Sequence, residues 1–532
     1  MFHQPEPNDV EMSEPVPPEE PEEPEEPEKP SQPPHLHFEN LPVEIHEAVL
    51  DHLFGVRAST LSSISPPKSN SSSWNKALRH PRRKALSDLA LVSPAWRRLV
   101  QERIYRHIRM EGTTDAFQDC ADWFAIHSHL APYVRHIEIW IPVLGDRTPK
   151  MHPLHRTRRD TGNDAASLSD ITLPRQSTDS SSDSASSSGA AGGVLAAGGR
   201  NATLQQIFYH ISCFFPDARI LTLEVCHCKK PPMIRYFDSD PWGQSDQEHL
   251  EVLPKIHTFV MEGAWNVMRD YQHWRTLSRA LPNLREWQCA YAKPKLESLA
   301  TISRILTNMP KQLTRLNISL EGFYSKSGAQ MHWFDAPQSD QHLCRLLGEI
   351  APQLESLTFT GKVCATLFTN IRAETLRSGS KSRLKSINLA VKACCREARN
   401  EDGSPILNEL SGVTNMNFIN AFERMILAAV RSLDALTAIE YMRIRFIDLD
   451  SACGLLNPYF QLVGDKCSGL WSETILETLH TAHPTARFEE LSDGILPQYG
   501  INSQTGTRLF PRTLPRSIKA SMYKIIADKS KT

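Results

Sequence analysis

The side chains best suited to chemistry in this chain are its thiols and imidazoles. Few of them are spaced so that they could bind one metal ion or act in one site. The sequence has 532 residues, with 11 cysteines and 21 histidines. Cys226-His227-Cys228 is a metal-like cluster, but no second ligand pair accompanies it at zinc spacing. Adjacent Cys394 and Cys395 are interpreted as ordinary thiols. We therefore expect no metal and no cofactor.

Motifs of catalysis are also missing from the sequence. It contains no P-loop, no G-x-G-x-x-G and no G-x-S-x-G, so we do not expect an enzyme. The basic runs at 76–84 and 97–109 are the segments closest to a nucleic-acid footprint. The second run belongs to a predicted amphipathic helix, so a solvated helical face is expected rather than nucleic-acid binding.

Two apolar segments near the start of the chain carry the strongest signal. In the first, Pro42 suits a first helical turn because its φ is fixed and it lacks an N–H group. From there Ile45, Val49 and Leu53 recur on one helical stripe, and Gly55 is a plausible stop.

The second segment has the same periodicity with a proline at its centre. Leu89, Val92, Trp96 and Leu99 form its apolar stripe. Pro94 should end one helix and open the next.

Together these segments resemble the F-box, a helical module that binds the Skp-family adaptor of cullin-based ubiquitin ligases, here of the filamentous-fungal type. The match covers residues 38–110, with a polar insertion at 55–84 where the family has a shorter link; loop closure costs little entropy, so the module should tolerate it. The family's adaptor-binding positions carried over are Leu41, Pro42, Ile45, Val49, Leu53, Leu89, Val92, Trp96 and Leu99. Trp96 is expected in the core of the module, whereas Leu41 and Pro42 are expected at its tip.

Two further segments of the chain differ from the rest in composition. The leader, residues 1–37, is rich in Pro and Glu, and residues 1–34 carry a net charge of −10, although the whole chain carries −2. The leader and the Ser/Gly-rich stretch 159–200 hold too few bulky apolar residues to fold alone and are predicted to be disordered. No signal sequence or run long enough to span a bilayer is found, so we expect an intracellular protein of the cytoplasm or nucleus, without membrane contact.

Between these stretches an irregular repeat is found, in which the frame apolar-x-x-apolar-x-apolar often follows a proline and a helical segment. The unit is therefore helix, proline stop and short strand. The frames begin at Val134, Ala218, Ile256, Leu284, Leu313, Leu354, Leu384 and Leu436.

This segment resembles the degenerate leucine-rich-repeat domain that often follows an F-box. The resemblance implies an α+β or α/β chain, in which a small helical F-box precedes an irregular leucine-rich-repeat-like α/β solenoid over 111–490, with the loop 159–200 inserted. The alternative is an ordinary α/β domain with a mixed sheet. Residues 442–479 suggest a last strand, a loop and a capping helix with Trp471, Ile475 and Leu479 on one face, and the basic tail 491–532 is expected to be a solvated end.

Alternate strand positions should point to a common recognition surface. These positions are Arg135, Glu138, Thr222, Arg285, Glu286, Arg315, Asn317, Glu355, Thr358, Lys385 and Asn388.

The expected function is that of a substrate receptor in an SCF-type ubiquitin ligase. Its partners would be a Skp-family adaptor, through it a cullin, and an unknown protein substrate held by the repeats. The alternative is a non-catalytic interaction scaffold with no part in ubiquitin transfer.

Overall fold

The computed structural model describes residues 87–142, 201–225, 234–291, 296–320, 342–379, 381–395, 412–447, 456–489 and 516–529, with short pieces at 45–46, 48–49, 500–501 and 508–509. The leader 1–37 and the stretch 159–200, both predicted to be disordered, lie outside these residues. The chain divides into two compact units, Met1–Pro66 and Pro67–Thr532, and the division falls within the polar insertion of the F-box-like segment.

Both apolar segments are helical over much of their described length, with a turn at 90–92 in the second. Ile45, His46, Ala48 and Val49 are helical in the first unit, and residues 87–89 form a helical turn in the second. The helix α3 (Pro94–Tyr105) then begins at the predicted proline. Its N-cap is Ser93, whose Oγ accepts a hydrogen bond from the Trp96 backbone N–H at 3.3 Å.

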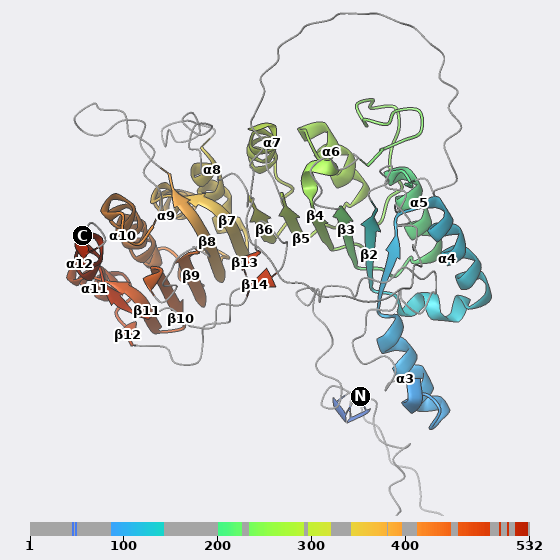
Figure 1. The fold of residues 1–532 in the computed structure, drawn as a ribbon, viewed down its shortest axis with the longest axis horizontal. Coiled ribbons are helices and arrows are strands. Elements are labelled where there is room, and N and C mark those ends of the chain that lie inside the picture. Colours follow the sequence, from blue (N-terminus) through green and yellow to red (C-terminus); the bar gives the residue numbers. More distant parts are fainter. Residues whose placement is uncertain are drawn as a thin grey trace, which may run out of the picture. The chain divides into compact units, whose positions relative to one another are not determined.

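A long sheet forms the centre of the second unit (Figure 1). Nine of its strands run parallel to one another. They are β1 (His107–Glu111), β2 (His136–Ile141), β3 (Ile220–Val225), β4 (Thr258–Glu262), β5 (Glu286–Ala290), β6 (Arg315–Ser319), β7 (Ser356–Val363), β8 (Ser386–Cys394) and β9 (Tyr441–Phe446).

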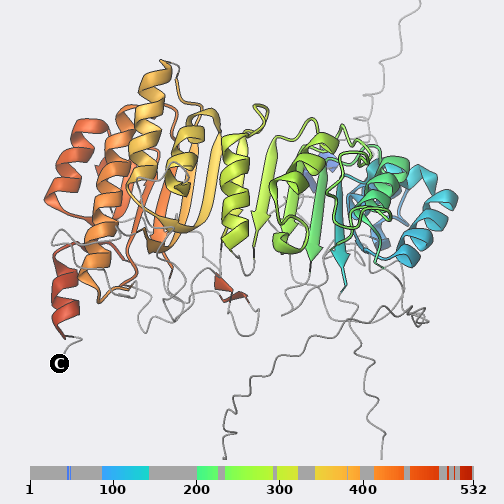
Figure 2. The same ribbon diagram turned by 90° about the horizontal axis from the view of Figure 1, so that it is seen from above.

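Helices cover one face of the sheet, as Figure 2 shows. Helices consecutive in the chain contact each other from α4 to α5 and from α6 through α11. A common face follows from right-handed crossovers that all turn the same way. These helices are α4 (Thr114–Ile126), α5 (Leu204–Phe214), α6 (Tyr271–Ala280), α7 (Leu296–Thr307), α8 (Leu343–Ile350), α9 (Thr366–Ser378), α10 (Met416–Arg431) and α11 (Glu473–Ala482). Short 3-10 helices are η3 (Ser128–Tyr133), η4 (Ala264–Asn266), η5 (Ala351–Gln353) and η6 (Ser432–Asp434).

Strand order along the sheet follows chain order from β1 to β12. From β2 to β9, each parallel strand is therefore bonded to the strand before it and the strand after it in the sequence. The predicted mixture of helices and strands is confirmed at this level: the fold is mixed α/β with a sheet dominated by parallel strands.

One row of side chains illustrates how the sheet buries its core. Leu316, Leu357 and Ile387 occupy paired positions on β6, β7 and β8 and are at most 2% exposed. Their neighbours Asn317, Thr358 and Asn388 point to the opposite face and are half-buried. Side chains alternate in this way because successive Cβ atoms of a strand point to opposite faces.

Seven of the predicted frames contain a strand that begins two residues after the first apolar position, as from Leu354 to Ser356. The eighth frame is wrong, because β9 begins at Tyr441, three residues later than a frame from Leu436 requires. The matching apolar set there is Ile439, Met442 and Ile444. The strand β1 was missed, since the segment after Arg97 was predicted as one helix, whereas α3 ends at Tyr105.

The far end of the sheet departs from the parallel pattern. β10 (Tyr459–Val463) and β11 (Lys466–Trp471) form an antiparallel hairpin on β9, which the sequence had not indicated. The predicted capping helix is α11, which buries Ile475 and Leu479, but Trp471 belongs to β11. β12 (Arg487–Phe488) pairs with β11 beyond the hairpin.

Part of the basic tail is folded rather than a solvated end. β15 (Ile518–Lys519) pairs with β11, and α12 (Met522–Lys529) contacts α10. The buried Tyr523 donates a hydrogen bond from its hydroxyl to the Leu456 carbonyl at 2.8 Å. A separate two-stranded pair joins β13 (Gly500–Ile501) and β14 (Arg508–Leu509).

Two neighbouring substitutions on β7 test the alternation of buried and polar side chains. Leu357→Ala should reduce the free energy of unfolding by about 2–5 kcal/mol, because it removes a fully buried side chain and leaves a cavity. Thr358→Ala, on the opposite face, should change it by less than about 0.5 kcal/mol. Urea unfolding followed by circular dichroism measures both values, and equal losses would contradict the strand register.

Candidate functional site

The structure describes part of the first F-box-like helix. Ile45 is 45% exposed and Val49 is half-buried, so Ile45 in particular is available to a partner. Leu41, Pro42 and Leu53 lie outside the described residues.

The second F-box-like segment is divided between exposed and buried positions. Leu91 and Val92, in the turn before α3, are 80% and 67% exposed, and Leu89 is half-buried. Trp96 and Leu99 are buried, on a helix that contacts η3 and β1. Val92 therefore offers apolar surface, whereas Trp96 and Leu99 serve internal packing. Leu91 was not among the predicted residues, although its exposure is greater.

The second candidate surface is the face of the sheet opposite α4–α11, which we call the polar face. Most of its side chains are polar, and they lie in rows across paired strands. The row through the middle of the strands consists of Arg109, Glu138, Thr222, Val260, Gln288, Asn317, Thr358, Asn388, Arg443 and Gln461. The predicted strand positions Glu138, Thr222, Glu286, Arg315, Asn317, Thr358 and Asn388 all lie on this face. Arg135, Arg285, Glu355 and Lys385 directly precede their strands.

Carboxylates gather at the β1–β4 end of the polar face. Arg109 lies between two of them: its Nε is 3.0 Å from Glu138 Oε1, and its Nη2 donates a hydrogen bond to Glu224. His107 stacks on His136 with ring centroids 3.9 Å apart, and His107 Nε2 is 3.1 Å from Glu138 Oε2. The guanidinium of Arg109 is therefore paired with two carboxylates, those of Glu138 and Glu224.

This sharing leaves Glu224 only partly compensated. Burial raises its pKa to about 7, and the carboxylates of Glu138 and Glu262 add to the increase. Arg109 lowers the pKa but does not outweigh burial, since its charge is also held by Glu138. Glu224 is thus expected to be partly protonated near neutral pH.

Cations gather at the β8–β10 end of the same face. Arg443 is 3% exposed and donates a hydrogen bond to the Tyr441 hydroxyl at 3.1 Å. Arg445 follows on the same face, and burial, with help from Arg443, lowers its pKa. Buried atoms here without a hydrogen-bond partner are Arg445 Nε and Nη1, both amide atoms of Gln461 and Asn388 Oδ1.

The polar face is therefore divided by charge, which the sequence did not show. A buried guanidinium with unpartnered N–H groups is costly unless an acceptor reaches it. The unpartnered atoms of Arg445 and Gln461 are themselves buried, and Arg443 and Gln461 are at most 3% exposed, so this end presents little cationic surface to a partner. The order of residue types along the sequence does not reveal which strands become neighbours, so this division could not be predicted.

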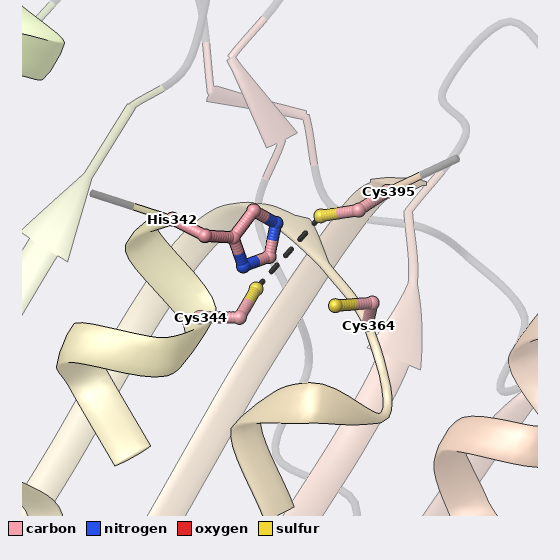
Figure 3. Close-up of side chains that lie close together, drawn as sticks. All are labelled: His342, Cys344, Cys364 and Cys395. Carbon is pink, nitrogen blue, oxygen red and sulfur yellow. Dashed lines mark hydrogen bonds between the residues drawn. The ribbon is translucent and has the colours of Figure 1, made fainter. Parts of the chain in front are cut away.

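One group of residues could hold a metal ion: His342, Cys344, Cys364 and Cys395, whose possible ligand atoms all lie within 4.8 Å of one another. Figure 3 shows their side chains turned toward one another. The sequence missed this group and treated Cys395 as an ordinary thiol. Cys226-His227-Cys228 lies outside the described residues.

Comparison with models of known protein families found no matching family, and searches of characterised proteins and of solved structures found no match either. None of the helices in the described part of the chain is long and apolar enough to cross a membrane.

Glu224 gives a pH-dependent prediction. Because its pKa is raised from 4.5 to about 7 in the folded protein, the folded state holds its proton more tightly, and stability is lost as pH rises through this window. Glu224→Gln should make the free energy of unfolding depend less on pH between pH 4.5 and about 7. It should also raise stability above pH 7. The exposed Asp119→Asn on α4 is the control. Parallel profiles for wild type and Glu224→Gln in urea titrations would contradict the raised pKa.

Proposed function

We propose that this protein is the substrate-recognition subunit of an SCF-type ubiquitin ligase, located in the cytoplasm or nucleus. In this role the F-box-like segments bind a Skp-family adaptor, the adaptor binds a cullin, and the sheet domain holds a protein target. The protein contributes position and effective concentration, and other subunits perform the chemistry. The observation that carries the proposal is the combination of an F-box-like sequence pattern with a sheet whose strands follow chain order.

The strand order supports an irregular leucine-rich-repeat-like solenoid. In such arrays each strand and helix unit contacts only its neighbours, and the strands stack in chain order with the helices on one side. The sequential pairing from β1 to β9 and the contacts from α6 through α11 have this character. Units of unequal length, such as those separating β2 from β3 and β8 from β9, account for the irregular spacing.

Exposed apolar side chains support the adaptor-binding part of the proposal. Ile45, Leu91 and Val92 are large apolar residues at 45%, 80% and 67% exposure. Isolated exposed apolar residues need no explanation, but these three belong to the two segments that resemble the F-box. Covering them with another polypeptide would bury surface that water now contacts.

The polar face supports the target-binding part. It extends across the parallel strands, and its side chains come from many separate units, as recognition surfaces of repeat domains do. Its two ends differ in charge, so a target with a complementary distribution of charge would bind in one orientation.

Adaptor binding is tested with purified components. Val92→Asp and Ile45→Asp should each weaken binding of a Skp-family adaptor at least tenfold, because each would bury a charge in an apolar contact. Leu376→Asp on α9 is the matched control, since Leu376 is also 60% exposed but lies among the repeats. Isothermal titration calorimetry measures the affinities, and circular dichroism confirms that each variant is folded.

Equal affinity for all three variants would contradict adaptor binding through these segments. Failure of the wild type to bind any adaptor, with a stable monomer in its absence, would instead favour the alternative, a non-catalytic interaction scaffold. Trp96→Ala is unsuitable as a binding test, because loss of this buried side chain should cost about 3–5 kcal/mol of stability.

Target binding is tested by a pair of surface arginines. Arg315, on the polar face, and Arg377, on α9, have side chains that are 59% and 73% exposed. Proteins cross-linked to the wild type in cells should be lost selectively with Arg315→Glu and kept with Arg377→Glu, as quantified by mass spectrometry. Identical recovery with both variants would argue against the polar face as the binding surface.

A further inference from the structure

We propose that His342, Cys344, Cys364 and Cys395 bind one zinc ion in a closed, structural Cys3His site. The inference is independent of the ubiquitin-ligase proposal, because it rests on the interior of the sheet domain. Figure 3 shows the four side chains, which converge from α8 and from the ends of β7 and β8.

Strand pairing brings the ligands together. Val363 of β7 is paired with Cys394 of β8, so Cys364 and Cys395 each follow a paired residue at the same edge of the sheet. The Cys395 N–H donates a hydrogen bond to the Val363 carbonyl at 3.1 Å, which fixes this alignment beyond the strands. Cys394 is 5% exposed and belongs to the core, and the partly buried Cys395 packs against the same core.

The first turn of α8 supplies the other two ligands. His342 occupies the N-cap, where Ser, Thr, Asp or Asn is usual, and its side chain makes no capping hydrogen bond. It is 5% exposed, and its Nδ1 is buried without a hydrogen-bond partner. A buried imidazole without a cap function and with a free nitrogen is suited to bind a metal ion.

The spacing fits a single tetrahedral ion. Zinc bound about 2.3 Å from each sulfur in a tetrahedron holds neighbouring sulfur atoms about 3.8 Å apart. Cys344 Sγ and Cys395 Sγ are 3.8 Å apart, whereas a disulfide would need about 2.0 Å. All four donors lie within 4.8 Å of one another, so one ion can reach them together.

Two of the sulfurs lie close to the first turns of helices. Cys344 lies in the first turn of α8, and Cys364 lies just before α9, so the positive ends of two helix dipoles face the sulfurs. Cysteines bind zinc as thiolates, so binding of the ion would release their protons.

The donor set identifies the class of metal. Thiolates and imidazole suit zinc and exclude the oxygen-preferring Mg²⁺ and Ca²⁺. Four protein ligands leave no open position, so the ion would stabilise the fold rather than activate water. It would join α8 to two successive strands, and thus link three elements of neighbouring units.

The test begins with the full-length wild type, purified without chelators. Mass spectrometry of the metal should find one zinc ion per chain, and replacement by Co²⁺ should give the visible bands of tetrahedral cobalt with a sulfur charge-transfer band. Removal of zinc by a chelator should lower the melting temperature. Each step uses the wild type, so none depends on a variant that fails to fold.

Variants then identify the ligands. Cys364→Ser should lose the zinc, whereas His342→Cys should keep it and shift the cobalt bands toward those of four thiolates. Cys213→Ser is the control, because Cys213 is an exposed thiol on α5. A wild type without zinc and without cobalt bands, a Cys344–Cys395 disulfide in its intact mass, or full zinc in Cys364→Ser would each overturn the proposal.

Discussion

The second unit depends on one constraint: each parallel strand must bond to its neighbours in the sequence and bury its apolar side chains under the helices on one face of the sheet. The rows of Leu316, Leu357 and Ile387 meet this constraint on one face, and the helices cover them there. A strand and helix cannot bury both of their faces alone, so each unit is stable only against the next. Polar side chains occupy the other face. On that face the carboxylates lie mainly at the β1–β4 end, and buried arginines lie at the β8–β10 end.

Much of this arrangement could be predicted from the sequence. The frame apolar-x-x-apolar-x-apolar located seven strands correctly, because the period of two in a strand and the proline after a helix are both local signals. The frame at Leu436 was misplaced, since Leu436 and Ile439 also fit the pattern but belong to the turn before β9. β1 was missed because Ile108 follows the buried Ile104 of α3 at a spacing of four residues, which continues the helical stripe.

The sites were predicted less completely, and for a different reason. The F-box-like residues were found from local spacing, but spacing could not distinguish the buried Trp96 from the exposed Val92. The thiol and imidazole cluster could not be found from spacing at all. His342 and Cys344 are close in sequence, but Cys364 and Cys395 reach them only through the register of β7 and β8. The charge difference along the polar face likewise depends on which strands are neighbours.

Strand order also bears on how the protein is made. From β2 to β9, each strand pairs on one side with a strand that has already left the ribosome, so the sheet can grow by one strand at a time during translation. The growing edge would be open after each addition, and open edges invite pairing with other chains. The antiparallel hairpin of β10 and β11 is added to β9, and the later strands β12 and β15 pair with β11, so this edge would be covered only after those segments have been made.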